Sequence, residues 1–425
     1  MHQDSSKPAL KAVPQPKRRI LFVEQFYYPD GWGGAELPLD LTIHLACAGF
    51  EVEVICGSDQ YAPVDGEPSP DPSLQGIRIR RIPALMRGNI HRAKLVRQLW
   101  FYAALLPLLL FRRPPDVVVA QTNPPLAVIL AAAVARMWGR PMVIIAMDVY
   151  PEVLIAHGTV RRDSAVVAVL ARAFKWAYRS ARRVVSLGPV MTGRLAFKGV
   201  DADRIVEIPN WATGKPGLIS GMGNTLYSEW QLDDKFVVLY SGNLGLAHEF
   251  ETLLQGVESA HRSMPSLRLI FIGRGSRLAE VKRRVGELGI ESIVRFSDPL
   301  ASERLPESFG IAQLAVVTLQ PGFEGLVVPS KLQGYMARGI PVLYIGPDSD
   351  IDRFIKRSSG GISVPCDDAQ GVASTLIELA ADHQRLAMLG LHGRQFYDAE
   401  FAKAHGLARY ESTIRSVLNP NSAAP

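Results

Sequence analysis

Cysteine is scarce in this sequence: the 425 residues contain three, and none of them stands in a CxxC or His/Cys ligand spacing. A disulfide framework and a structural zinc site are therefore not indicated, and a reducing cytosol fits. Two nucleotide-binding signatures are also missing, because no GxGxxG is followed by an acidic residue at the usual distance and no GxxxxGK[ST] occurs. NAD-linked and P-loop enzymes are accordingly disfavoured.

The apolar segment from Leu99 to Phe111 has no charge over 13 residues, which is too short to span a bilayer, since that needs about 20. Basic residues flank it between Arg92 and Arg113, and residues 100–102 are aromatic. These features favour a segment that lies in the headgroup layer of a membrane. A helix in the protein core remains equally open, because periodicity does not separate the two. "ARAFKWAYRSARR" is a second basic and aromatic stretch.

Basic residues outnumber acidic ones, and the net charge is +6. This excess favours an anionic partner, which could be nucleic acid, anionic lipid or a phosphorylated small molecule. No stacking motif accompanies the basic residues, so we expect no nucleic acid. Residues 1–18 are polar, basic and proline-containing without an apolar core. We expect them to form a flexible tail and not a signal peptide.

Length and pattern predict an α/β protein with two doubly wound domains. A chain of 425 residues exceeds what one core usually supports. From Arg19 onward, short apolar runs alternate with longer helical stretches, which is typical of parallel α/β layers. The Gly- and Pro-rich "IPNWATGKPGLISGMGN" predicts a linker. We assign residues 19–212 to the first domain, 213–400 to the second, and 401–418 to a final helix that packs back on the first.

Glycine-bearing turns follow the predicted strands of the second half, in "YSGNLG" and "FIGRGS". In open parallel sheets, ligands bind beyond the carboxyl ends of the strands. Any one of these turns is most simply a tight turn. Together they predict a nucleotide diphosphate site, where backbone amides contact phosphate and cations balance the charge of the departing group. The residues that we assign to it are Gly242, Asn243, Gly245, Gly273 and Arg274.

A Pro-Ser-Lys stands between two apolar runs in "GLVVPSKLQGYMARGIPVLYIGP". Ser330 followed by Gln333 is a capping-box pattern, which predicts a helix that runs to about Ala337 and has Lys331 in its first turn. The helix dipole disfavours a cation there, so we expect an anion beside it, with Lys331 as a point charge on phosphate. The alternative is that Lys331 extends into water, as most lysines do.

Candidate cleft residues also occur in the first half. Asp148 ends an apolar run in "AMDVYPEV" and Glu152 follows it. A carboxylate there could orient or deprotonate an acceptor hydroxyl, and the alternative for Asp148 is a helix N-cap. Gly33 and Gly34 would let the backbone approach a ligand just before a helix. The Asp-Ser-Asp of residues 348–350 resembles a metal-binding Asp-x-Asp, but its place before a helix favours capping.

These motifs together resemble the family-4 retaining glycosyltransferases of the GT-B fold, and among them bacterial exopolysaccharide enzymes of the colanic-acid type. The resemblance covers nearly the whole chain from Arg19 to Leu418. It is carried by "GGAELPLDLTIHLACAGFEVEVIC", "DVVVAQTNPPL", "MDVYPEV", "YSGNLGLAHEFETLL", "FIGRGS" and, most specifically, "GLVVPSKLQGYMARGIPVLYIGP". It implies two Rossmann-like doubly wound domains that face each other across a cleft.

The resemblance further implies transfer of a sugar from a nucleotide donor, bound mainly by the C-terminal domain, to an acceptor held by the N-terminal domain. No metal and no cofactor are implied. By position, the expected contacts with the nucleotide or diphosphate are Asn243, Arg274, Ser330 and Lys331, and the expected contact with the sugar is Glu324. Gly33 and Gly34 would form the cleft floor, and Asp148 would lie on the acceptor side.

The chain departs from the family in the two glutamates that many members carry, separated by seven residues, before a Gly-x-Pro-Val. Leu326 and Gly334 stand at those places, and the usual Arg/Lys pair after the "SGN" loop is also absent. We interpret this as altered donor contacts and not as lost activity. Lys331 and Arg274 would then supply the positive charge.

The sequence therefore predicts a glycosyltransferase at the cytosolic face of a membrane that extends a polyprenyl-diphosphate-linked glycan for a surface polysaccharide. Two alternatives stay open. One keeps the fold and changes the reaction to nucleotide-sugar 2-epimerisation or glycoside phosphorolysis. The other is a non-catalytic member that binds a sugar nucleotide and acts as a scaffold. The missing glutamates favour the scaffold, whereas the converging charges of Lys331, Arg274 and Asp148 favour an enzyme.

Overall fold

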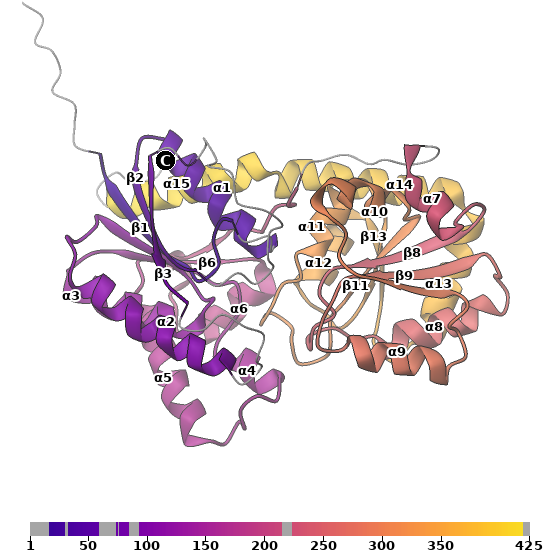
Figure 1. The fold of residues 1–425 in the computed structure, drawn as a ribbon, viewed down its shortest axis with the longest axis horizontal. Helices are drawn as coiled ribbons and strands as arrows, with labels where there is room; N and C mark the ends of the chain where they lie inside the picture. Colours follow the sequence, from indigo (N-terminus) through magenta and orange to yellow (C-terminus); the bar gives the residue numbers. More distant parts are fainter. Residues whose placement is uncertain are drawn as a thin grey trace, which may run out of the picture.

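Two parallel β-sheets lie side by side and carry helices on both faces (Figure 1). The computed structural model describes residues 17–29, 33–58, 74, 76–84, 93–214 and 223–419. The predicted α/β class with two parallel sheets is confirmed. Most of the predicted tail lies outside the described residues, and so does Arg92.

The N-terminal sheet has seven parallel strands in the order β3-β2-β1-β4-β5-β6-β7. Its strands are β1 (Arg19–Val23), β2 (Glu51–Gly57), β3 (Ile77–Ile82), β4 (Val117–Gln121), β5 (Met142–Ile145), β6 (Arg183–Ser186) and β7 (Ile205–Glu207). All five residues of the central strand β4 are buried. Strands in a parallel sheet are covered on both faces, which is why they are near-continuous apolar runs in the sequence.

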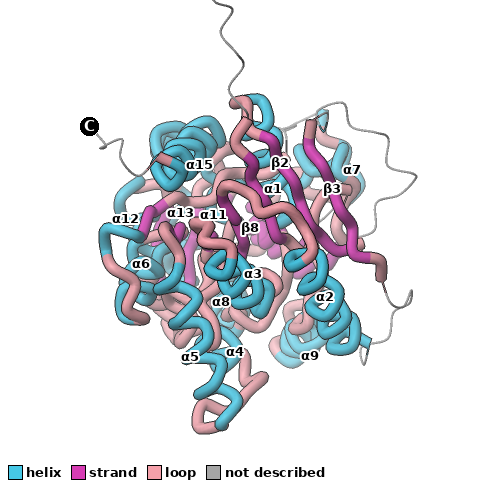
Figure 2. Tube along the Cα trace, turned by 90° about the vertical axis from the view of Figure 1, so that its left-hand side faces the viewer, coloured by secondary structure: helices cyan, strands magenta, loops and turns pink. Residues whose placement is uncertain are grey.

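Different sets of helices cover the two faces of this sheet. They are α1 (Gly33–Cys47), α2 (Ala93–Leu110), α3 (Pro125–Met137), α4 (Glu152–Ala156), α5 (Ala165–Ser180), α6 (Pro189–Phe197) and the 3₁₀ turn η2 (Ala202–Arg204). α1 packs on one face together with the last helix, α15 (Lys403–Leu418). α2, α3 and α5 form a layer on the other face, with α3 between the other two (Figure 2).

The C-terminal sheet has six parallel strands in the order β10-β9-β8-β11-β12-β13. These strands are β8 (Phe236–Ser241), β9 (Leu267–Ile272), β10 (Val294–Ser297), β11 (Leu314–Thr318), β12 (Val342–Ile345) and β13 (Gly361–Val364). The helical elements are α7 (Thr225–Trp230), α8 (Glu251–His261), α9 (Leu278–Glu287), η4 (Ser302–Arg304), α10 (Leu305–Gly310), α11 (Lys331–Met336), α12 (Asp350–Ser358), α13 (Ala369–Ala381), α14 (His383–Phe396) and the π-helical turn η5 (Tyr397–Phe401). Burial of both faces again explains the apolar strands.

The last helix, α15, leaves the C-terminal domain and lies against α1 of the N-terminal domain (Figure 1). Its Glu411 carboxylate is 2.8 Å from Nε2 of His44 on α1. Its Tyr410 ring packs edge-on against Trp211, whose indole N–H donates to Asp40 at 2.9 Å. The end of the chain and the segment around Trp211 are thus both attached to α1.

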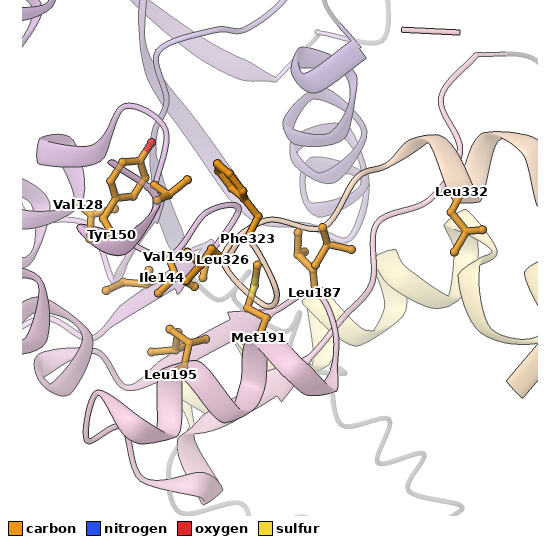
Figure 3. Packing of buried hydrophobic residues seen from close by; sticks show 14 of the residues in the cluster. Val128, Ile144, Val149, Tyr150, Leu187, Met191, Leu195, Phe323, Leu326 and Leu332 are labelled. Atoms are coloured by element: carbon orange, nitrogen blue, oxygen red, sulfur yellow. The ribbon is translucent and has the colours of Figure 1, made fainter. Parts of the chain in front are cut away.

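A loop of the C-terminal domain is inserted into the core of the N-terminal domain. Figure 3 shows Phe323 and Leu326 of this loop among side chains of the other domain, including Val149 and Met191. The N–H of Val149 donates to the Leu326 carbonyl at 2.9 Å. Asp148 forms an antiparallel bridge with Val327, and this bridge joins the two domains beside the candidate site.

Candidate active site

Two glycine turns at neighbouring strand ends form one corner of the candidate site. Gly242 follows β8 with φ of +126°, and Gly273 follows β9 with φ of +148°. These conformations are rare for residues with a side chain. A Cβ on Gly242 would lie 2.8 Å from Cε of Lys331, and a Cβ on Gly273 would collide with the Gly242 carbonyl. Glycine is therefore needed at both positions, because backbone and lysine approach each other so closely.

Lys331 lies over this corner. Its Nζ is 3.1 Å from Nε2 of His248 and donates to the Asn243 carbonyl at 3.4 Å. It also stands 4.9 Å from the centre of the Tyr240 ring. Among the described residues, no carboxylate forms an ion pair with it, and burial lowers the pKa of Lys331 to about 7. The alternative that Lys331 simply extends into water is wrong, since its ammonium group is turned inward against His248 and Tyr240.

His248 is a site residue that the sequence analysis missed. Its Nδ1–H donates to the Thr318 carbonyl at 2.8 Å, so its Nε2 is the acceptor for the Lys331 ammonium. Burial, followed by the charge of Lys331, lowers the pKa of His248 to about 3. The ring is therefore a neutral acceptor at physiological pH. In the sequence, a single histidine after a turn gives no indication that its side chain will accept a hydrogen bond from a distant lysine.

The two arginines near this corner have different environments. Arg274 is largely exposed and pairs with Asp298 at 2.9 Å, at the rim of the site. Arg277 was not singled out in the sequence, although it donates to the His248 carbonyl and stacks on Phe250 at 5.5 Å. Arg277 therefore stabilises the loop that carries His248. Arg274 instead pairs with Asp298 and makes no contact with Lys331.

The capping box predicted for the Pro-Ser-Lys helix does not form. Ser330 has a helical conformation and makes no capping bond, and the buried Gln333 side chain leaves its Oε1 without a partner. The helix α11 itself forms as predicted, with Lys331 in its first turn and its end at Met336, next to Ala337. Its position is fixed from the opposite side, since the Tyr335 hydroxyl accepts a bond from the Ser241 N–H at 2.8 Å. A long-range bond therefore replaces the local cap.

Asp148 lies at the domain junction. Its N–H donates to Oγ1 of Thr122 at 3.0 Å, and its side chain is bonded to Tyr150. Burial raises the pKa of Asp148 to about 6, although the bond from Tyr150 opposes this shift. It does not cap the following helix, because the residue that precedes α4 is Pro151. The bridge to Val327 brings Asp148 next to the chain that leads into Lys331.

Other predicted site residues are directed elsewhere. The Glu324 carboxylate accepts the Gly322 N–H at 3.0 Å and lies 3.9 Å from Arg194 of the N-terminal domain. Glu152 is bound to the buried Lys198 at 2.7 Å, so its charge is already compensated. Gly33 and Gly34 are the first two residues of α1. The close approach of Gly245 is to the Asn243 amide, 2.8 Å from the position of a Cβ.

Two residues of the Asp-Ser-Asp at 348–350 bind the N–H groups at helix starts, as the place of this motif before a helix predicts. Ser349 accepts from the Asp352 N–H at 3.4 Å and caps α12. Asp350 instead accepts two N–H groups at the start of α6 in the other domain, from Val190 at 2.7 Å and Met191 at 3.2 Å. Within the described residues, no three His, Cys, Asp or Glu side chains gather as a metal site would require.

Comparison with protein families finds two matches that follow the two domains. Residues 33–211 match the glycosyl transferase 4-like domain. Residues 228–396 match the glycosyl transferases group 1 domain. The first match contains the acceptor-side candidate Asp148, and the second contains the whole corner around Lys331.

Individual proteins agree with these matches. A relative from Pseudomonas aeruginosa, named probable glycosyltransferase WbjE, is 28% identical over 314 residues, which cover 72% of this chain and 76% of the relative. WcaI from Escherichia coli (strain K12), whose name assigns it to colanic acid biosynthesis as a glycosyl transferase, is 27% identical over 178 residues, 41% of this chain and 43% of the relative. The crystal structure of HepE from Anabaena with UDP and glucose superposes with a TM-score of 0.69 at 16% identity, covering 94% of this chain and all of the other.

The fold and these matches define a glycosyltransferase with the GT-B architecture of two Rossmann-like domains. Within that class the chain belongs to the family-4 type, and the predicted resemblance is confirmed. The protein is accordingly an enzyme.

Proposed function

We propose that this enzyme transfers a sugar from a nucleoside diphosphate sugar to a lipid-linked glycan during the synthesis of a bacterial surface polysaccharide. The donor occupies the corner around Lys331, and the acceptor lies on the Asp148 side. The reaction retains the anomeric configuration and needs neither metal nor cofactor. The enzyme works at the cytoplasmic face of the membrane, on a polyprenyl-diphosphate carrier.

The observation that carries this proposal is the ammonium group of Lys331, which is turned inward over two glycine turns without a carboxylate partner. A partly buried cation still loses hydration, which costs free energy unless the cation is paired. A diphosphate at this corner would supply the missing charge and would raise the lowered pKa of Lys331. The N–H groups of Gly242 and Gly273 donate to the Ile272 and Ser297 carbonyls. Contrary to the sequence prediction, these two amides are therefore not available to phosphate, and Lys331 provides the attraction. HepE, of similar fold, was crystallised with UDP and glucose, which supports this type of donor.

The same residues account for catalysis. The bond between the sugar and the diphosphate breaks, a bond to the acceptor oxygen forms, and the acceptor hydroxyl loses its proton. Lys331 stabilises the charge that develops on the leaving diphosphate. Asp148 orients the acceptor hydroxyl or takes its proton, which requires the carboxylate form above its pKa of about 6.

A thermal-shift panel of nucleoside diphosphates and nucleotide sugars tests the donor site, since a ligand that binds only the folded protein raises the melting temperature. We expect a selective shift with one nucleotide. Lys331→Ala should abolish it and lower turnover by about a hundredfold, the loss typical for one such electrostatic contact. Lys282→Ala, which changes a lysine on α9 in the same domain, is the matched control. Full activity of Lys331→Ala would contradict the assignment.

The alternative reactions differ in what they release. Transfer releases nucleoside diphosphate only when an acceptor is present, whereas 2-epimerisation releases none and phosphorolysis needs phosphate. A selective thermal shift without any turnover on membrane-extracted glycan lipids would favour the scaffold. Turnover that persists in excess chelator is expected for a metal-independent enzyme, and its loss would contradict that part of the proposal.

A further inference from the structure

The exposed apolar side chains of the described residues gather on one layer of the N-terminal domain. Of the fourteen large hydrophobic side chains that are exposed, ten lie on α2, α3, α5 and α6 or directly after α2. They are Val96, Leu99, Trp100, Leu106, Phe111, Met137, Val166, Val169, Trp176 and Phe197. Figure 2 shows α5, α3 and α2 next to one another on this side of the molecule. We call this surface the α2–α3–α5 face.

The face carries positive charge and no negative charge from its helices. The sequences of α2, α3, α5 and α6 contain no Asp or Glu. Their cations include Arg97, Arg136, Arg172, Lys175 and Arg179, none of which forms an ion pair within the described part of the chain. In contrast, the arginines on or next to the C-terminal helices α8 and α9 each pair with a glutamate of these helices, namely Arg262, Arg277, Arg283 and Arg284. The lack of carboxylates is therefore a property of this face and not of the whole surface.

A cavity of about 500 Å³ opens at the end of α5. Its basic lining residues are Arg136, Arg172, Lys175, Arg179 and Arg204. The Trp176 side chain lines the same cavity, and Phe197, which is 92% exposed, lies two residues before the lining residue Gly199. Asp201 is the one acidic residue of the lining, and it is paired with Arg204 at 3.2 Å. Phosphate groups suit such a cavity, and exposed aromatic rings beside it suit the interfacial layer of a membrane.

We propose that the α2–α3–α5 face docks on an anionic phospholipid bilayer, with headgroup phosphates in the cavity beside Trp176. This inference deepens the proposed function, because it names the surface that brings the enzyme to a lipid-linked acceptor. Self-association through this face would place cations against cations with no carboxylate to compensate, which is unfavourable. None of the described helices is long and apolar enough to cross a bilayer. In the proposed docking, this face lies on the membrane surface.

The docking extends and corrects the prediction made for the apolar segment alone. Arg112, one of the basic residues predicted to flank that segment, is bound to the buried Glu53 and is unavailable to lipid. The aromatic residues also separate, because Phe101 is buried whereas Trp100 is half-exposed and donates to the Pro83 carbonyl at 2.8 Å. The cations of α5 and α3 supply the charge that Arg112 does not.

Flotation with phosphatidylcholine vesicles, with and without phosphatidylglycerol, tests the proposal. We expect the full-length protein to bind the anionic vesicles and to dissociate as salt is raised. The variant Arg172→Gln/Lys175→Gln/Arg179→Gln should bind about a hundredfold more weakly, since each cation near such a surface contributes roughly fivefold. Its control is Lys356→Gln/Arg385→Gln/Arg409→Gln, three exposed cations on α12, α14 and α15.

A second pair of variants tests the apolar part. Leu99→Gln/Leu106→Gln on α2 should weaken binding about tenfold, because less apolar surface enters the interfacial layer. Met388→Gln/Leu391→Gln on α14 removes two similarly exposed side chains and should have no effect. Equal binding to both kinds of vesicle, or equal losses in the variants and their controls, would overturn the proposal. A dimer in solution that fails to bind vesicles would assign the face to a second copy instead.

The nucleotide thermal shift separates this proposal from that of the donor site. Each docking variant should keep the wild-type shift, which also shows that it is folded. If the wild type binds vesicles but responds to no nucleotide, the donor site fails and the docking face stands. If it responds to nucleotide but binds no anionic vesicle, the docking face fails and the donor site stands.

Discussion

Burial displaces the pKa values of the two candidate site residues Asp148 and Lys331 in opposite directions. It raises the pKa of Asp148 to about 6 and lowers the pKa of Lys331 to about 7. Both shifts have the same cause, since a site with little water disfavours either charge. Each group is therefore poised to titrate near neutral pH, as groups that act on substrates often are.

Replacing Asp148 by Asn should separate its effects on stability and on turnover. The folded-state pKa is raised, so the folded protein binds this proton more strongly and the charged form is disfavoured above about pH 6. The resulting loss in the free energy of unfolding becomes smaller as the pH falls from 6 toward 3.8, the ordinary pKa of an aspartate. Asp148→Asn should therefore raise the melting temperature at pH 8 but not at pH 4. Turnover should fall about a hundredfold and lose its acidic limb near pH 6.

The control is Asp163→Asn, which alters an exposed aspartate of the same domain that pairs with Arg161. Unchanged turnover of Asp148→Asn at pH 8 would contradict a role on the acceptor. A melting temperature that changes equally at both pH values would contradict the raised pKa.

His248 should affect donor binding through Lys331 and not directly. His248→Ala removes the acceptor 3.1 Å from Nζ, so the lysine loses its fixed position and the KM for the donor should rise about tenfold with little change in kcat. His248→Gln supplies another neutral acceptor and should restore most of the affinity. The His248 ring itself should contribute no titration between pH 6 and 8, because the wild-type ring is neutral there. Equal losses in both variants would show that the ring acts only by packing.

At the scale of elements, the two domains meet through the start of α6 and the loop before α11. Asp350, which is 1% exposed, accepts two N–H groups of α6, and Gly188 has no room for a side chain beside that carboxylate. In the loop, a Cβ on Gly325 would lie 2.9 Å from the Val190 backbone. Both contacts need glycine because backbone, helix end and carboxylate approach closely.

Gly325→Ala should therefore loosen the domain contact. Gly325 has φ of +66°, and Gly158 has nearly the same φ of +67° with nothing within 4 Å of its Cβ position. Alanine at either site has the same backbone strain of about 1 kcal/mol, but only Gly325→Ala adds the collision, for which we expect a further 1–3 kcal/mol or so. Denaturant unfolding of both variants measures the difference. Equal losses would mean that the loop shifts freely and does not determine the domain contact.

At the scale of the whole molecule, one hydrophobic cluster runs through both domains. It extends from Ile144 of the N-terminal sheet through Phe323 and Leu326 of the loop to Val317 of the C-terminal sheet. A second cluster belongs to the C-terminal domain alone, and a third contains the contact of α15 with α1. Continuous apolar packing and the crossing helix both oppose independent unfolding of the domains.

Calorimetry should therefore show a single unfolding transition for the wild type. Phe323→Ala removes a buried ring of the loop and should cost about 3–5 kcal/mol. We expect it to split the transition in two, with nucleotide raising only the transition of the C-terminal domain. Phe250→Ala, which alters a ring buried within the C-terminal cluster alone, is the control and should lower stability without separating the domains. Two transitions in the wild type would contradict this coupling.

The sequence alone determined the architecture, and it singled out the glycine turns and the lysine of the proposed donor corner. Strands that are covered on both faces are apolar runs in the sequence. Tight turns with a positive φ contain glycine. Both patterns are local, so they can be recognised without knowledge of the fold. The same locality explains why Gly242, Gly273 and Lys331 were singled out, since each follows an apolar run within three residues. The family motifs added the glycosyltransferase class.

The tertiary structure alone decided which side chains meet. Lys331 and His248 are 83 residues apart, and Asp350 reaches the Val190 amide over 160 residues. Arg274 was expected at the diphosphate but pairs with Asp298, while Arg277 braces the His248 loop. The α2–α3–α5 face exists only because these three helices, which contain no Asp or Glu, lie in one layer. A sequence pattern specifies backbone conformation over a few residues, whereas burial, charge pairing and pKa depend on neighbours that only folding brings together.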